Sequence, residues 1–298
     1  MKTFPSGEGG PPQAVDEVTM QNFPIIVTTG RKPTEADHAR AEYAAETLGG
    51  RVVPRRSDSV AAISEKYGAP VIVVARDDTI VLEEANDTMF FHPSMAHVRL
   101  KNIRLHGAAD HLITALDIKP GQSVLDCTLG LGADAIVESY AVGEKGQVVA
   151  LEASPLIAIA MGYGLAHHNG ENNYDTVSAM RRVQVVNADY RDYLKSLPDK
   201  SFDAVYFDPM FRHPMEKSVA LSPLRELAEG SPLDEDSVKE AYRVARHRVV
   251  MKEAWYSKEF DRLGFTEFSG GKWSKVRYGI IRVDKKIDTT HSILCSTH

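Results

Sequence analysis

Cysteine is scarce in this chain, with only two among its 298 residues, Cys127 and Cys295. Cys127 lies in an apolar run and Cys295 lies close to the last residue, so we expect no structural disulfide. Neither cysteine has a C-x-x-C or H-x-x-x-H pattern near it, which are spacings typical of zinc ligands. We therefore expect no metal site.

Long apolar runs are also missing. No uninterrupted run approaches the roughly 20 residues that a membrane helix needs. The nearest, residues 156–166, is short and rich in glycine and alanine. The opening stretch MKTFPSGEGGPPQAVDEV has no apolar core of the kind that a secretory signal requires. These absences predict a cytoplasmic protein without a membrane partner.

Positive charge is outnumbered, because 35 lysines and arginines face 41 aspartates and glutamates, for a net charge of −6. This balance disfavours non-specific binding to nucleic acids, which requires a basic surface. Residues 97–106 and 241–252 nevertheless carry cations and no acid. Taken alone, each run is most simply a solvated face. The hydrophobic fraction of 43% and the charged fraction of 26% are typical of a globular protein.

The N-terminal part divides into a tail and a small folded unit. Residues 1–23 are rich in glycine and proline and lack periodicity, so we expect a flexible tail. Residues 24–95 alternate apolar runs with helical spacing, which predicts a small α/β domain whose role the residues do not reveal. Its expected strands and helices cover residues 25–29, 34–48, 51–54, 59–67, 71–75 and 79–85.

A larger domain is predicted over residues 96–290, with a tail at 291–298. A basic linker leads into a helix at about 108–118, and strands then alternate with helix-length segments. That alternation is typical of parallel βαβ units in an open sheet. A hairpin at 264–283 ends the domain, so the predicted fold is α/β, a Rossmann-like class I methyltransferase sheet, mostly parallel with a C-terminal antiparallel hairpin. The expected parallel strands are 123–127, 148–152, 183–189, 202–208 and 248–252.

The loop VLDCTLGLGADA follows the first of these strands and opens a helix. Gly130 and Gly132 allow a tight turn and a close approach of the backbone to a ligand. The pattern by itself also fits NAD. However, Asp126 stands at the strand end, where NAD-binding proteins usually stay apolar, and Asp134 at the helix start places negative charge where a pyrophosphate would lie. These carboxylates suit the sulfonium and ammonium groups of S-adenosylmethionine, which we favour over NAD.

Acidic residues also stand at the ends of the next two strands. Glu152 is placed to accept the two ribose hydroxyls of a nucleoside cofactor, although a helix-capping acid is the alternative. Asp189 is placed to accept a hydrogen bond from an adenine amino group, and a loop carboxylate is nearly as good an interpretation. The acids together with the glycine loop predict a cofactor site more strongly than any one of them does.

The fourth strand ends in Asp-Pro-Met-Phe at residues 208–211. This resembles the (Asp/Asn/Ser)-Pro-Pro-(Tyr/Phe) signature of methyltransferases that act on planar exocyclic amines. Asp208 and the Pro209 carbonyl are placed to accept the two N–H hydrogens and so to direct the nitrogen lone pair to the methyl group. The ring of Phe211 is placed to stack on the base. The alternative is a structural Asp-Pro turn with a buried phenylalanine.

Several segments together resemble a family, the RsmJ-type methyltransferases of small-subunit ribosomal RNA, which act on guanine N2, and most of all their YpiP-type relatives. The resemblance covers about residues 95–255 and implies a methyltransferase that uses S-adenosylmethionine and releases S-adenosylhomocysteine. It is carried by MAHVRLKNIRLHG, VLDCTLGLGADA, LEASP with the later GLA, YFDPMF-x-H with Lys217-Ser218, and RVVMK.

The resemblance also implies positions for the cofactor contacts. The sequence departs from the family in having Ala133 after the second glycine, Ala153 beside Glu152, and Asp189 where the RNA enzymes carry serine. The implied contacts are Ala133, Asp134, Glu152, Ala153, Asp189, Tyr190 and Asp208.

Substrate contacts are expected from His213, Lys217 and Lys252, which follow the fourth and fifth strands. The resemblance implies ribosomal RNA or the small ribosomal subunit as partner, while oligomeric state stays open. The acidic net charge keeps a small-molecule amine as a second candidate acceptor. Two further functions stay open at this point, those of an NAD-dependent oxidoreductase and of a non-catalytic factor that binds S-adenosylmethionine.

Overall fold

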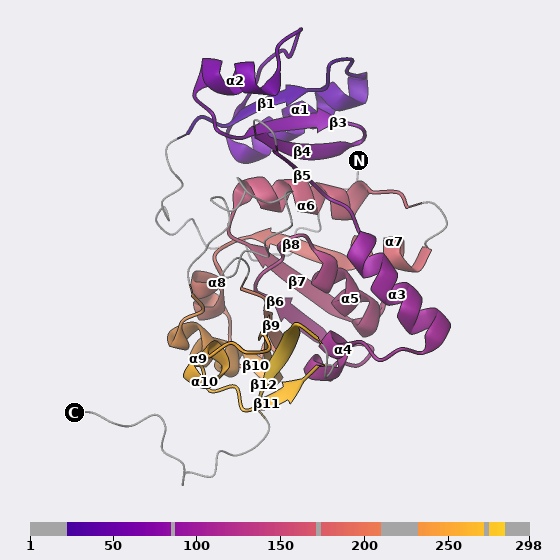
Figure 1. The fold of residues 1–298 in the computed structure, drawn as a ribbon, viewed down its shortest axis with the longest axis vertical. Helices are drawn as coiled ribbons and strands as arrows, with labels where there is room; N and C mark the ends of the chain where they lie inside the picture. Colours follow the sequence, from indigo (N-terminus) through magenta and orange to yellow (C-terminus); the bar gives the residue numbers. More distant parts are fainter. Residues whose placement is uncertain (1–22, 85–86, 171–173, 210–231, 271–273, 284–298) are drawn as a thin grey trace, which may run out of the picture.

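The computed structural model describes residues 23–84, 87–170, 174–209, 232–270 and 274–283, which form two sheets arranged along the long axis of the molecule (Figure 1). The smaller sheet has five strands and the larger has seven. Helix α6 (Pro155–His167) lies between them and contacts both.

The smaller sheet has the strand order β2-β1-β3-β4-β5. β1 pairs in parallel with β2 and β3, and β3, β4 and β5 follow as antiparallel neighbours. The helix expected after Thr34 begins there, because Thr34 and Asp37 form a capping box. The elements are β1 (Ile26–Thr29), α1 (Glu35–Leu48), β2 (Arg51–Val52), α2 (Val60–Tyr67), β3 (Ile72–Arg76), β4 (Thr79–Glu84) and β5 (Asp87–Phe90).

The larger sheet has the order β11-β12-β10-β9-β6-β7-β8. Its strands from β10 to β8 are parallel, and β12 runs antiparallel to both β10 and β11. The predicted fold class is therefore confirmed, including the C-terminal hairpin. The strands are β6 (Ser123–Asp126), β7 (Gln147–Glu152), β8 (Val183–Asn187), β9 (Phe202–Phe207), β10 (Ala245–Ala254), β11 (Glu267–Ser269) and β12 (Val276–Arg282).

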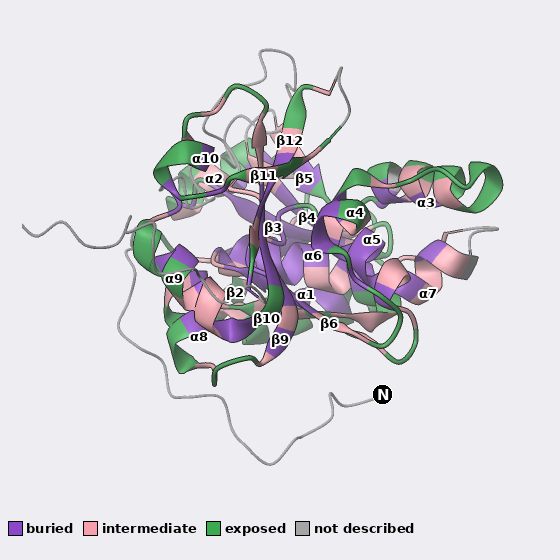
Figure 2. Cartoon of the chain, turned by 90° about the horizontal axis from the view of Figure 1, so that it is seen from below, coloured by how far each residue is buried: buried purple, intermediate pink, exposed green. Residues whose placement is uncertain are grey.

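Alternation along the strands produces two cores, because successive side chains point to opposite faces of a sheet. Val124 packs in one core and Leu125 in the other, as do Tyr206 and Val205. Figure 2 shows the strands buried between helices. One face carries α3 (Ser94–His106), α4 (His111–Leu116), α5 (Ala133–Val142), α6 and α7 (Tyr174–Arg182), and the other carries α8 (Tyr190–Ser196), α9 (Glu235–Val244) and α10 (Glu259–Arg262).

The predicted basic linker before residue 108 is wrong, because this stretch is helix α3. Its start has no side-chain hydrogen bond at the N-cap, Pro93, so the usual signal of a helix start is missing. Ala96, Leu100 and Ile103 recur at helical spacing and face α5, while the opposite side of α3 is exposed (Figure 2). Packing of this apolar stripe stabilises the helix.

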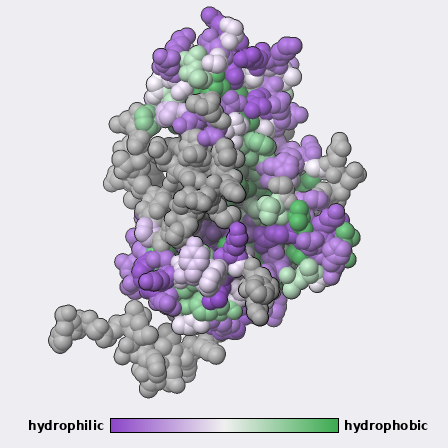
Figure 3. All heavy atoms as spheres, viewed as in Figure 1, coloured by the Kyte–Doolittle hydropathy of each residue, from purple (hydrophilic) through white to green (hydrophobic). Residues whose placement is uncertain are grey.

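The two sheets share one core. Phe91, which follows β5, is buried against the larger unit, and a Cβ at Gly164 of α6 would stand 2.2 Å from its ring. Arg40 of α1 is also buried and donates from Nε to the hydroxyl of Tyr163 at 2.9 Å. The outer surface of the smaller unit is largely hydrophilic (Figure 3).

No helix among the described ranges has the length and apolar character needed to cross a bilayer. The proposed division at residues 95 and 96 stays a prediction. Both predicted tails fall on residues that are largely outside the described ranges.

Candidate functional site

The predicted acids gather at one edge of the larger sheet. β6, β7, β8, β9 and β10 are parallel, so their carboxyl ends meet on the same side. Asp126 and Glu152 are the last residues of β6 and β7. Asp208 directly follows β9, and Asp189 lies two residues beyond β8.

The glycine loop between β6 and α5 is held by Glu152. Gly130 and Gly132 have φ angles of 51° and 77°, a left-handed region that side chains disfavour. Glu152 accepts hydrogen bonds from the backbone N–H of Gly130 at 3.3 Å and of Ser154 at 3.0 Å. Burial raises the pKa of the Glu152 carboxyl to about 7, although these backbone donors oppose the rise. Glu152 thus links the loop to the start of α6.

Asp126 lies beneath this loop and is fully buried. Its Oδ1 accepts from the backbone N–H of Thr128 at 2.9 Å, whereas Oδ2 has no hydrogen-bond partner in the described part of the chain. Burial raises the pKa of the Asp126 carboxyl well above its usual range, and the negative charges of Asp134 and Asp208 add to the rise. The buried, unpartnered oxygen marks a place where a ligand would be favourable.

Asp134, in the first turn of α5, is surrounded by donors. It accepts from the Tyr206 hydroxyl and from Lys252 Nζ, both at 2.9 Å, and it also pairs with Arg99. Burial alone would raise the pKa of the Asp134 carboxyl, but the two cations outweigh burial and hold it below its usual range. The charge of Asp134 is therefore balanced within the protein.

Asp208 is bound to the same lysine. Its Oδ2 accepts from Lys252 Nζ at 2.7 Å, and its backbone N–H donates to the Thr128 hydroxyl at 2.6 Å. Burial raises the pKa of the Asp208 carboxyl, and Lys252 opposes that rise. Pro209, which follows, is half-buried at the same edge. Lys252 lies within β10 between two carboxylates, and the substrate contact expected of it stays a prediction.

Asp189 and Tyr190 occupy the start of α8. Asp189 caps the helix by accepting from the backbone N–H of Arg191 at 2.7 Å. The ring of Tyr190 is buried in the second core, edge-on to Phe207 with ring centroids 5.5 Å apart. Their roles toward the adenine stay predictions.

The remaining predicted residues fall into two groups. Ala133 is the first residue of α5 and Ala153 follows β7, so both lie beside the glycine loop and Glu152. Phe211, His213 and Lys217 lie outside the described residues.

The sequence alone did not assign Arg99 or Tyr206 to this site. Arg99, on α3, bridges Asp110 at 2.8 Å and Asp134, although the basic run had indicated a solvated face for it. Tyr206 is on β9, two residues before Asp208, and a spacing of two places their side chains on the same face of the sheet. That spacing is the signal that could have found it.

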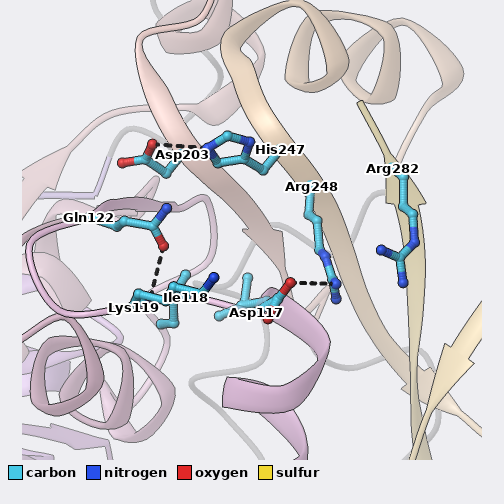
Figure 4. A pocket seen from close by; sticks show the side chains of 9 residues that line it. Asp117, Ile118, Lys119, Gln122, Asp203, His247, Arg248 and Arg282 are labelled. Carbon is cyan, nitrogen blue, oxygen red and sulfur yellow. Dashed lines mark hydrogen bonds and ion pairs between the residues drawn. The ribbon is translucent and has the colours of Figure 1, made fainter. Parts of the chain in front are cut away.

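A cavity of about 360 Å³ lies at the opposite ends of the strands and contains none of the predicted residues (Figure 4). Two residues of the basic run at 241–252, His247 and Arg248, line this cavity. Arg248 donates to Asp117 at 2.8 Å and to the Ala115 carbonyl at 2.7 Å. Figure 4 also shows His247 against Asp203, 3.6 Å apart. This run is thus largely paired with acids.

The residues at the carboxyl edge fit S-adenosylmethionine. Glycines with positive φ allow close backbone approach, the buried Oδ2 of Asp126 lacks a partner among the described residues, and Glu152 stands at the neighbouring strand end. Within the described ranges, no group of three or more histidines, cysteines or acids is arranged to hold a metal ion.

Comparison with known proteins agrees with this geometry. A family model described as "Putative SAM-dependent methyltransferase" matches residues 60–264. Protein YpiP of Bacillus subtilis is 38% identical over 258 residues, which are 86% of this chain and 99% of that protein. Ribosomal RNA small subunit methyltransferase J of Dechloromonas aromatica is 32% identical over 55% of this chain and 65% of its own length. Its counterpart in Pseudomonas syringae pv. tomato is 28% identical, over 59% of this chain and 67% of its own length.

A solved structure shares the fold. NGO1261 of Neisseria gonorrhoeae, a SAM-dependent methyltransferase, aligns with 89% of this chain and 99% of its own, with a TM-score of 0.59 and 19% sequence identity. At this identity, the likeness concerns the fold alone.

Proposed function

Because the chain belongs to the family of putative SAM-dependent methyltransferases, we propose that it methylates the exocyclic amine of a guanine in the RNA of the small ribosomal subunit. Methyl transfer from S-adenosylmethionine is the activity of the family. What we propose is the identity of the methyl acceptor. It is supported by the Asp-Pro pair at the end of β9 and by the names of the RNA methyltransferases J among the relatives.

The position of Asp208 carries the proposal. An aromatic amine is a poor nucleophile because its lone pair is delocalised into the ring. Asp208 Oδ2 is occupied by Lys252, while Oδ1 has no hydrogen-bond partner among the described residues. This oxygen and the Pro209 carbonyl can accept the two amine hydrogens, which orients the lone pair. S-adenosylmethionine supplies an electrophilic methyl group on its sulfonium sulfur.

Proton removal needs no dedicated base in this scheme. The amine is cationic once it carries the methyl group and is then strongly acidic, so it loses its proton readily. The reaction does require that Asp208 is ionised. A carboxylate only accepts hydrogen bonds, whereas a protonated carboxyl group also carries a donor hydrogen that would face the amine hydrogens.

Helix α3 supports a nucleic acid as the acceptor. Residues 94–106 contain three arginines and lysines and no acid, in a chain whose net charge is −6. Arg99 is used inside the site, and Arg104 pairs with Asp175 at 2.8 Å on the surface. Lys101 is exposed. Cations of this kind bind phosphates and orient an RNA without reading its sequence.

Mass spectrometry of nucleosides tests the proposal. Ribosomal and transfer RNA would be compared between cells with and without the gene, and between cells restored with the native chain or with Asp208→Ala. We expect a methylated guanosine to disappear from small-subunit RNA and to return only with the native chain. Unchanged profiles in every RNA fraction would reject an RNA acceptor and favour a small-molecule amine.

A further inference from the structure

Lys252 lies between two carboxylates of the site. It lies within β10, and its ammonium group is 2.9 Å from Asp134 Oδ2 and 2.7 Å from Asp208 Oδ2. Its side chain is 23% exposed, as is that of Asp208, while that of Asp134 is 12% exposed. A lysine this deeply placed between two carboxylates is poorly disposed to bind an RNA phosphate.

The lysine is itself fixed in place. Asp134, its anchor, is held by Arg99 from α3 and by the Tyr206 hydroxyl from β9 at 2.9 Å. Tyr278 of the neighbouring strand β12 lies opposite Lys252 in the antiparallel pairing of β12 with β10. These contacts come from four different elements. The ammonium group is therefore positioned by the fold before any substrate arrives.

We propose that Lys252 is a positioning residue for Asp208, whose carboxylate it keeps ionised and fixed through Oδ2 while Oδ1 stays available to the acceptor amine. The inference rests on the proposed function, because it assigns the reason why Asp208 can accept hydrogens from an amine. Without Lys252, Asp208 would face neighbouring acids with no cation beside it.

The electrostatics of the surroundings support this role. Burial and the charges of Asp134 and Glu253 raise the pKa of the Asp208 carboxyl, whereas the charge and the hydrogen bond of Lys252 lower it. Loss of Lys252 would raise that pKa further, so Asp208 would take up a proton at higher pH. The titratable and charged groups around Asp208 in the described elements are Arg99 of α3, Asp126 of β6, Asp134 of α5, Tyr206 of β9, Lys252 and Glu253 of β10, and Tyr278 of β12.

Two substitutions of the full chain separate charge from shape. Lys252→Met removes the charge and keeps the length of the side chain, and Lys252→Arg keeps a cation. Lys239→Met serves as a control, because Lys239 is an exposed lysine on α9 that pairs with Asp236. Where Lys252→Met does not fold, Lys252→Gln takes its place, because it removes the charge, keeps a hydrogen-bond donor and leaves Asp134 unchanged.

The first readout is the titration of the Asp208 carboxyl carbon by NMR, with its signal assigned by its loss in Asp208→Asn. We expect Lys252→Met to raise the pKa of Asp208 by about one or more, and Lys252→Arg and Lys239→Met to leave it close to the native value. An unchanged pKa in Lys252→Met overturns the proposal. This readout needs no RNA, so it stands even where no RNA accepts a methyl group and the proposed function fails.

The second readout is the pH profile of methyl transfer to small-subunit RNA. We expect activity to fall at low pH as Asp208 takes up a proton, and this acid limb to move to higher pH by about one unit in Lys252→Met. Lys252→Arg restores the native limb. A loss of activity that is equal at every pH would mean that Lys252 supports the structure only, and would overturn the proposal.

Discussion

Glu152 is a single residue with two tasks at the site. Its carboxylate holds the glycine loop through Gly130 and the start of α6 through Ser154. Each carboxylate oxygen has more than one lone pair, so these bonds leave room for the hydroxyls of a ribose. Because burial raises the pKa of Glu152 to about 7, only part of the Glu152 carboxyl groups are ionised at mildly acidic pH. Only the ionised form accepts hydrogen bonds at both oxygens without carrying a proton.

Cofactor binding should therefore depend on pH. Below its pKa the Glu152 carboxyl is protonated and must lose its proton to accept both hydroxyls, which costs about tenfold in affinity per pH unit. We expect the affinity for S-adenosylhomocysteine, measured by calorimetry, to rise steeply from about pH 5.5 to about pH 7 and then to level off. The Glu152→Gln variant should bind more weakly and lose most of this slope. A native profile that is flat would contradict the proposed role.

Substitution of Asp208 should lower turnover and leave cofactor binding largely unchanged. Asp208→Ala is expected to reduce the rate of methyl transfer roughly a hundredfold or more, since an orienting acceptor acts mainly in the transition state. Glu152→Ala should do the reverse and weaken S-adenosylhomocysteine binding first. Equal losses of cofactor affinity in both variants, with no separate effect on turnover, would remove the role given to Asp208.

The acids at the strand ends could be predicted from the sequence because they follow from local rules. Each apolar strand is followed by its acid, and parallel strands bring those acids to one edge. The pairing of Lys252 with Asp134 and Asp208 could not be predicted from the sequence, because it depends on the register of β10 against β9 and on the packing of α5. The contact of Arg99 with Asp134 could not be predicted either, because α3 had been interpreted as a linker.

At the scale of elements, α3 has two chemically different sides. Its inner side is apolar and carries Arg99, while Met95, Val98 and Leu105 are exposed together with Lys101 on the outer side. Hydrophobic and hydrophilic residues accordingly lie side by side on this surface of the molecule (Figure 3). In the proposed function, this outer side is the part of α3 available to the RNA.

Removal of the outer cations should weaken RNA binding alone. The double variant Lys101→Ala and Arg104→Ala is expected to lower affinity for small-subunit RNA severalfold and to reduce the salt dependence by up to about two phosphate contacts. Affinity for S-adenosylhomocysteine should stay native. Filter binding over a series of salt concentrations measures the RNA affinity and its salt slope, and calorimetry measures the cofactor affinity. A salt slope unchanged from the native chain would exclude α3 from the RNA interface.

At the scale of the whole molecule, the two sheets depend on each other. Phe91 follows the last strand of the smaller sheet and packs against α6, and its ring also lies 3.8 Å from where a Cβ on Gly132 would stand. The smaller unit thus reaches the glycine loop of the larger one. The sequence predicted both α/β units but did not indicate this contact, because it joins segments far apart in the chain.

Phe91 should therefore contribute to both stability and cofactor binding. Phe91→Ala is expected to cost about 3–5 kcal/mol of the free energy of unfolding, and to weaken S-adenosylhomocysteine binding as the loop loses its support. The adjacent Phe90 is 50% exposed, against 3% for Phe91, and provides a matched control. Phe90→Ala should stay within about 0.5 kcal/mol of the native chain. Urea unfolding and calorimetry would be used, and equal effects of the two substitutions would contradict the shared core.

The inner side of α3 is linked to Asp208 by a series of three ion pairs. Arg99 pairs with Asp134, Asp134 with Lys252, and Lys252 with Asp208. A substitution that removes Arg99 would leave Asp134 with only Lys252 and the Tyr206 hydroxyl as its partners. Its effect would therefore extend through that lysine to a carboxylate that Arg99 itself does not bind.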